Sequence, residues 1–530
     1  MSGFDWEFPY TSQRMPVLAA NVVATSQPLA AQAGLRMLLK GGNAVDAIVA
    51  TAITLTVVEP VMNGIGSDSF ALVWDGERLH GLNASGRAPE AWTPQRFAGR
   101  DSMPITGWDT VTVPGAVSGW VALSKRFGRL PFSELFGPAM DYAERGYLVS
   151  PTVARQWESQ VPRFQSEPGF ADAFMPGGRA PRAGELFRLP AQARTLQLIA
   201  ESGGEAFYRG ELSAKIAAAS LAQGGAMTTQ DLAAHQADWV DPISQSYRGL
   251  RLHEIPPNGQ GIAALMALGM LERFDLASLA PDSVDTVHLQ LEATKLAFAD
   301  MYRHVSDPRS MRMSAADLLD PGYLKTRASR IDPKRAQDFG HGTPPQSGTV
   351  YLAAADASGM MVSYIQSNYM GFGSGVVVPD TGIAMQNRGA CFVLASGHPN
   401  QVGPGKRPFH TIIPAFATKD ERALMSFGVM GADMQPQGHV QMMVRLADYH
   451  QNPQAAADGP RWKVLPGSKV IVEHAMPATT VAGLAQRGHD IRQVERWNME
   501  FGSAQLIHRL EGGGYLAASE PRRDGQAVGF

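Results

Sequence analysis

A threonine at position 349 lies between a polar, proline-containing segment and an apolar run typical of a buried strand. The sequence there is P-P-Q-S-G-T-V-Y-L-A-A-A, residues 344–355. If the chain were cut before Thr349, its hydroxyl would be a nucleophile and its new α-amine, with an ordinary pKa of about 7.7–8.0, a base. Gly348 permits the strained backbone that such a cut requires. Local features alone favour the plainer alternative, that a β-branched threonine opens a strand.

Signatures of other catalytic sites are missing from the sequence. It has no G-x-S-x-G, H-E-x-x-H or P-loop, and G-F-G-S-G at 371–375 is not followed by Lys-Ser/Thr. The thirteen histidines are scattered, with none in a context typical of a general base. His288 and Glu292 have helical spacing for a metal, but no third ligand is suggested nearby. We therefore expect no metal and no organic cofactor.

Composition limits the classes of protein and of partner. The chain has 530 residues, of which 44% are hydrophobic and 18% charged, and its formal net charge is -3. These values are typical of a soluble globular protein and favour a small-molecule substrate over nucleic acid or a membrane. A single cysteine, Cys391, excludes an intramolecular disulfide. The N-terminal residues lack the pattern of a signal peptide, so we expect a cytoplasmic protein.

The elements around Thr349 are predicted by apolar runs and turn residues. Runs at 349–355 and 360–366, joined by D-A-S-G, predict a hairpin that is buried on both faces. Asp75-Gly76 predicts the turn of a second hairpin. Residues 26–59 predict two helices, the first capped by Ser26 and the second beginning after Gly41-Gly42-Asn43. The sequence thus predicts helices packed on a sheet.

A further helix is predicted at 287–302, where apolar residues recur at helical spacing. Glu292 and Lys295 on this helix are expected to form an exposed ion pair.

Seven stretches form a set along the chain. They are K-G-G-N-A-V-D-A (40–47), P-P-N-G-Q-G (256–261), E-A-T-K-L-A-F-A-D (292–300), G-T-V-Y-L-A-A-A-D-A-S-G (348–359), G-F-G-S-G (371–375), G-K-R-P (405–408) and G-V-M-G-A-D (428–433). In order and spacing the set resembles the γ-glutamyltransferase family of N-terminal-nucleophile hydrolases. This resemblance implies an α/β fold, a four-layer αββα sandwich, and a precursor that cleaves itself.

The resemblance also implies where the precursor is cut. The bond would be Gly348–Thr349, which leaves a large chain of 1–348 and a small chain of 349–530. Both chains would remain associated in one αββα unit, and a homodimer of such pairs stays open.

Residue-by-residue matching implies catalytic roles. Ser367 matches a family threonine whose hydroxyl lies near the nucleophile. Gly431 and Ala432 match paired glycines whose N–H groups form the oxyanion hole. An alanine there is tolerated unless its φ is positive, which costs about 1–2 kcal/mol.

Four substrate-recognition positions depart from the family pattern. Where the family has an arginine, an asparagine and an aspartate, this chain has Ser85, Tyr369 and Cys391. Where the family has a pair of serines, it has His410 and Thr411. Asn368 is adjacent to one of these positions. We therefore expect the reaction type to be retained and the γ-glutamyl group not to be the substrate.

Three motifs, N-A-S-G-R-A-P, S-N-Y-M-G-F-G-S-G and Q-P-Q-G-H, look like the amidohydrolase branch of the family, which includes oxamate amidohydrolases and cephalosporin-acylase-like enzymes. Candidates to bind a substrate carboxylate are Arg87, Arg388 and Arg407, each of which would serve equally well in a structural ion pair. Candidates to line the pocket are Gln435 and His439.

The sequence thus predicts a self-processing amidohydrolase that uses the hydroxyl and α-amine of Thr349. Four alternatives remain open: a true γ-glutamyltransferase or glutathione hydrolase, a cephalosporin-type acylase, an uncleaved binding homologue, and a protein in which Thr349 is purely structural. The acyl group, the leaving amine and any competition between transfer and hydrolysis are not determined by the sequence.

Overall fold

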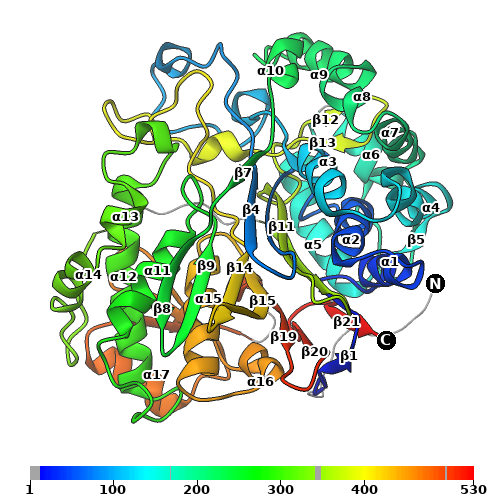
Figure 1. Ribbon diagram of the computed structural model, residues 1–530. Coiled ribbons are helices and arrows are strands. Elements are labelled where there is room, and N and C mark those ends of the chain that lie inside the picture. Colours follow the sequence, from blue (N-terminus) through cyan, green and yellow to red (C-terminus); the bar gives the residue numbers. More distant parts are fainter. Residues whose placement is uncertain (1–11, 168, 341–347, 496–497) are drawn as a thin grey trace.

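Two antiparallel sheets of seven strands form the centre of the protein (Figure 1). The computed structural model describes residues 12–167, 169–340, 348–495 and 498–530. The first sheet has the order β1-β20-β19-β15-β14-β9-β8, with the strands Val17–Ala19, Tyr515–Ser519, Ser503–Arg509, Arg422–Met430, Ala415–Lys419, Leu250–Glu254 and Ile243–Tyr247. The second has the order β21-β2-β10-β11-β3-β4-β7, with the strands Gln526–Gly529, Val22–Thr25, Gly348–Ala355, Met361–Tyr369, Asp68–Trp74, Leu79–Ala84 and Asp238–Val240.

Helices cover the outer face of each sheet (Figure 1). The second sheet is covered by helices that include α1 (Pro28–Leu39), α2 (Ala44–Val58), α3 (Ala116–Phe127) and α5 (Pro151–Phe164). The first is covered by helices that include α11 (Gly261–Leu271), α12 (Val284–His304) and α15 (Met434–Ala447). None of the helices in the described residues is long and apolar enough to cross a membrane.

Alternation along β10 shows how the layers are held together. Val350, Leu352 and Ala354 pack into the apolar cluster that contains α2. Tyr351 and the alternate residues after it pack into the cluster between the two sheets. Because successive side chains of a strand point to opposite faces, one strand contributes to both cores. The predicted αββα arrangement and the doubly buried hairpin are confirmed.

Two local predictions are wrong in an instructive way. The N-cap of α1 is Gln27, whose side chain accepts from the N–H of Leu29, whereas the Ser26 hydroxyl donates to buried Glu59. Glu292 and Lys295 do form an ion pair, but both side chains are fully buried. Each outcome depends on a partner or a covering layer distant in sequence.

Candidate active site

Thr349 lies opposite a β-bulge in the pairing of β10 with β11. Gly348 pairs with Tyr369, whereas Val350 pairs with Gln366. Two residues of β11, Ser367 and Asn368, therefore face the single residue Thr349. Bulges re-aim side chains and are frequent beside active sites.

The Ser367 hydroxyl links the candidate nucleophile to the candidate scissile bond. Thr349 Oγ1 donates to Ser367 Oγ at 3.1 Å, and Ser367 Oγ donates to the Gly348 carbonyl at 2.7 Å. The Tyr369 N–H also donates to Ser367 Oγ, at 2.7 Å. The hydroxyl is thereby oriented to polarise the carbonyl that Thr349 would attack.

Gly431 and Ala432 follow β15 and line a cavity of about 470 Å³ together with Gly348 and Thr349. No hydrogen bond in the described part of the chain uses the N–H of either Gly431 or Ala432. The φ of Ala432 is 54° and that of Gly431 is 131°. The condition under which an alanine is strained here is thus met, at a cost of about 1–2 kcal/mol. Two free N–H groups beside a hydroxyl suit an oxyanion.

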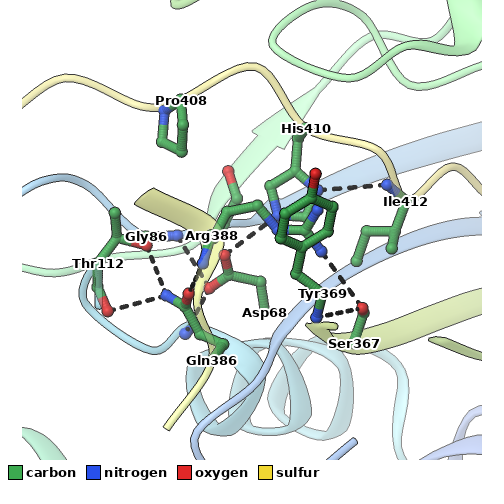
Figure 2. A network of polar contacts seen from close by, with 12 residues as sticks. Asp68, Gly86, Thr112, Ser367, Tyr369, Gln386, Arg388, Pro408, His410 and Ile412 are labelled. Carbon is green, nitrogen blue, oxygen red and sulfur yellow. Dashed lines mark hydrogen bonds and ion pairs between the residues drawn. The ribbon is translucent and has the colours of Figure 1, made fainter. Parts of the chain in front are cut away.

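Arg388 contacts Ser367 (Figure 2) and does not line this cavity. Its guanidinium donates to Thr411 Oγ1 at 2.7 Å and to Ser367 Oγ at 3.3 Å, and it lies 4.5 Å from the centre of the Tyr369 ring. The side chain is fully buried. Arg388 therefore positions the hydroxyl that contacts Thr349.

Asp68, which the sequence analysis did not identify, completes the buried network (Figure 2). Its carboxylate accepts from His410 Nε2 at 3.1 Å and from the N–H groups of Gly86 and Gly115 at 3.1 and 3.0 Å. Burial raises the pKa of Asp68 to about 7, although Arg388 opposes this rise. Burial also holds the pKa of His410 well below its usual range. No sequence motif marks Asp68, because its partners come from distant segments.

The other residues named from sequence lie in the surrounding wall. Asn368 accepts from the Ser67 hydroxyl at 2.8 Å, Gln435 accepts from the Ile413 N–H at 2.9 Å, and His439 lies 2.6 Å from Glu254. None of these three side chains lines the cavity that contains Thr349.

Arg87 and Arg407 are engaged in ion pairs. Arg87 pairs with Asp307 at 3.2 Å and Arg407 with Asp238 at 2.5 Å, and neither lines the cavity with Thr349. The basic residues that do line it are Arg155, Arg163, Lys463, Arg522 and Arg523. A sequence pattern that could have identified Arg155 and Arg163 is the helical spacing of polar residues between 152 and 163.

A second cavity, of about 880 Å³, is lined by the Tyr369 ring and by Cys391, Tyr302 and Phe409. Since the backbone N–H of Tyr369 contacts Ser367, this tyrosine lies between the candidate nucleophile and the second cavity.

A third candidate metal ligand, His489, lies beside His288 and Glu292. The three ligand atoms lie within 4.8 Å of one another, and His288 Nδ1 is 2.8 Å from His489 Nε2. The Glu292 carboxylate, however, already binds the buried ammonium group of Lys295. A second cation at this carboxylate would be repelled by that charge.

Comparisons with known proteins show the family to which the chain belongs. The family model for gamma-glutamyltranspeptidase matches residues 30–530. The glutathione hydrolase-like YwrD proenzyme of Bacillus subtilis is 38% identical over 96% of this chain and 98% of that protein. The oxamate amidohydrolase proenzyme of Klebsiella pneumoniae is 37% identical over 95% of this chain and 97% of that protein. The crystal structure of cephalosporin acylase from Bacillus halodurans superposes with a TM-score of 0.96 and 49% identity, covering 100% of this chain and 99% of that one.

Proposed function

Because the chain belongs to the γ-glutamyltranspeptidase family of N-terminal-nucleophile hydrolases, we propose that it cleaves its own Gly348–Thr349 bond and then hydrolyses an amide of a carboxylate-bearing substrate through Thr349. One observation carries this proposal. The Thr349 hydroxyl, the Ser367 hydroxyl and the N–H groups of Gly431 and Ala432, which donate no hydrogen bond within the described residues, lie at or beside one cavity.

Self-cleavage begins when Thr349 Oγ attacks the Gly348 carbonyl carbon, which the Ser367 hydrogen bond polarises. A C–O bond forms, the C–N bond breaks, and the Thr349 nitrogen takes the hydroxyl proton. Water then hydrolyses the resulting ester, which leaves a carboxylate on Gly348 and restores the hydroxyl. The products are chains of 1–348 and 349–530.

The two products stay together because their strands alternate within the sheets. Strand β10 of the small chain pairs with β2 of the large chain, and β11 pairs with β3. In the other sheet β14 pairs with β9. Separation would expose both the apolar cores and the ladder hydrogen bonds.

In turnover the free α-amine of Thr349 takes the proton from its own hydroxyl as Oγ attacks the substrate amide. The N–H groups of Gly431 and Ala432 stabilise the tetrahedral oxyanion. The ammonium group returns the proton to the leaving nitrogen, and water releases the acyl group.

The substrate is an amide with a carboxylate. The names of two relatives suggest oxamate or a cephalosporin-type amide. A cavity of about 470 Å³ favours the larger of these, because it falls within the range of about 300–1,000 Å³ that suits ligands much bigger than oxamate. The four changed recognition positions disfavour a γ-glutamyl group.

Intact mass and N-terminal sequencing of the purified protein, beside Thr349→Ala, test the proposal. We expect a small chain that begins T-V-Y-L, and one uncut chain in the variant. Ammonia or amine release would then be compared for oxamate, glutaryl-p-nitroanilide and γ-glutamyl-p-nitroanilide. A persistent single chain in both proteins would refute self-processing, and turnover of γ-glutamyl-p-nitroanilide above the other two would identify a γ-glutamyl enzyme instead.

A further inference from the structure

Helix α5 presents a polar face to the cavity that contains Thr349. Residues of this face recur at helical spacing and line the cavity: Thr152, Arg155, Gln156, Ser159, Gln160 and Arg163. The opposite face carries Val153, Trp157 and Phe164, which pack into the apolar core. Since the core anchors one face, the other face is held rigidly against the cavity.

This polar face lies on the Gly348 side of the candidate nucleophile. A methyl group built on Gly348 would lie 3.5 Å from the Gly371 nitrogen, and one built on Gly371 would lie 2.7 Å from the side-chain amide carbon of Gln160. Self-cleavage would create the Thr349 α-amine at the same side. A leaving group that takes its proton from this amine must therefore lie toward α5.

The basic residues of the cavity differ in their partners. Lys463 pairs with Asp433 at 3.0 Å, and Arg522 pairs with Glu473 and with Glu520. These two cations are neutralised within the protein.

Arg163 and Arg523 form no ion pair within the described residues. Among the described residues, Arg163 donates to the Ile105 carbonyl at 3.2 Å and to the Met370 sulfur at 3.3 Å, and its guanidinium lies 4.6 Å from the centre of the Phe164 ring. Arg523 is 8% exposed, its Nε has no hydrogen-bond partner within the described ranges, and its Nη1 contacts the Met499 sulfur at 3.7 Å. Burial lowers the pKa of both guanidinium groups. The carboxylates of Glu59, Glu520 and Asp524 partly oppose this effect at Arg523 without forming a direct ion pair with it. A desolvated guanidinium group that lacks a direct ion pair would be stabilised by an anionic ligand.

We propose that Arg163 and Arg523 form the binding site for a carboxylate on the leaving group of the substrate, with Gln156 and Gln160 as hydrogen-bonding neighbours. The inference rests on the proposed function, since it assigns the leaving group by the position of the Thr349 α-amine. It deepens that function, because it predicts an amine product that is itself an acid, such as an amino acid or an aminobenzoate, rather than ammonia.

The test compares two amides that share one acyl group. Glutaryl-4-aminobenzoate carries a carboxylate on its leaving group, and glutaryl-anilide does not. For the processed wild-type enzyme we expect a KM about 10- to 100-fold lower for the aminobenzoate, as lost charge-assisted hydrogen bonds imply. Arg163→Met should abolish this difference by raising the KM for the aminobenzoate to that for the anilide, whereas Arg163→Lys should restore part of it. Equal KM values in the wild type would overturn the proposal.

Binding of the product supplies a readout that does not need turnover. Titration calorimetry should show that 4-aminobenzoate binds the processed enzyme at least 10-fold more tightly than aniline does, and that Arg163→Met and Arg523→Lys each weaken it. Arg145→Met is the matched control, because Arg145 lies on an exposed helix surface outside this cavity. Equal binding of both amines, or an equal loss in the control, would overturn the proposal.

Failure of this inference is distinguishable from failure of the proposed function. If Thr349→Ala remains uncut while the wild type processes and hydrolyses amides without preferring an acidic leaving group, only the site at Arg163 and Arg523 is refuted. If the wild type stays uncut, the proposed function fails first.

Discussion

Arg388 and the pair Arg163 and Arg523 lie near Thr349 and differ in what they bind. Arg388 is fully buried and holds Ser367 and Thr411, with Asp68 nearby as a compensating carboxylate. Arg163 and Arg523 border the cavity that contains Thr349 and form no direct ion pair among the described residues. A guanidinium group whose hydrogen bonds the protein already supplies positions its neighbours, whereas one without a direct ion pair is available to a ligand.

The largest effect is expected from replacing Thr349, which contacts Ser367 and lines the cavity with Arg163 and Arg523. Thr349→Ala should abolish self-cleavage and lower any amidase activity by roughly 10³-fold or more, because nucleophile and base are lost together. Electrophoresis and activity assays measure both. Thr349→Ser keeps a hydroxyl and should still be cut, more slowly. Activity of the alanine variant at the wild-type level would mean that Thr349 is only structural.

Ser367→Ala should have the next largest effect, since it disconnects Arg388 from the reacting groups. Loss of the hydrogen bond to the Gly348 carbonyl is expected to slow self-cleavage by about 10²–10³-fold, as for one oxyanion donor. The time course of conversion from one chain to two measures this rate. Ser426→Ala is the control, because the buried Ser426 hydroxyl has no hydrogen-bond partner in the described part of the protein. The same half-time in both variants would contradict the role of Ser367.

Asp68→Asn tests the compensating carboxylate through the pH dependence of stability. Folding raises the Asp68 pKa from 3.8 to about 7, so the folded protein binds a proton that the unfolded chain releases above pH 4. The contribution of Asp68 to stability is therefore present below about pH 4 and is lost as the pH rises to about 7, at up to about 1.4 kcal/mol per pH unit.

Asparagine does not titrate, so the variant should not lose this contribution. As the pH rises from about 4 to about 7, the free energy of unfolding of the variant should therefore increase relative to that of the wild type. Chemical denaturation at pH 4, 5.5 and 7 measures the difference between the two proteins, in which other titrating groups cancel. A difference that does not change with pH would show that Asp68 is charged in the folded protein across the whole range.

The smallest effect is expected at Ala432, which lines the cavity that contains Thr349. Ala432→Gly relieves a positive φ and should stabilise the protein by up to about 1 kcal/mol, while leaving the backbone N–H and the activity in place. Ala432→Val should destabilise it, because a β-branched residue tolerates this φ less well. Thermal denaturation with parallel activity assays measures both. A glycine variant that loses activity without losing stability would show that the Ala432 methyl group contacts the substrate.

Local patterns predicted much of the central framework. The hairpin of β10 and β11 and the turn at Asp75-Gly76 were predicted because apolar runs and turn residues determine strands over short distances. Asn43 caps α2 where the Gly-Gly-Asn signal placed it. The candidate nucleophile was identified in the same way, from a glycine and a threonine at the start of an apolar run.

The sequence by itself thus determined the elements, the family resemblance and the place of Thr349. Only the tertiary structure decided which charges are satisfied. It buried Lys295 with Glu292, paired Arg87 with Asp307, brought Asp68 to His410, and left Arg163 lining a cavity. The physical reason is range: helix and turn propensities act over a few residues, whereas burial and ion pairing depend on segments that meet only after the sheets have packed.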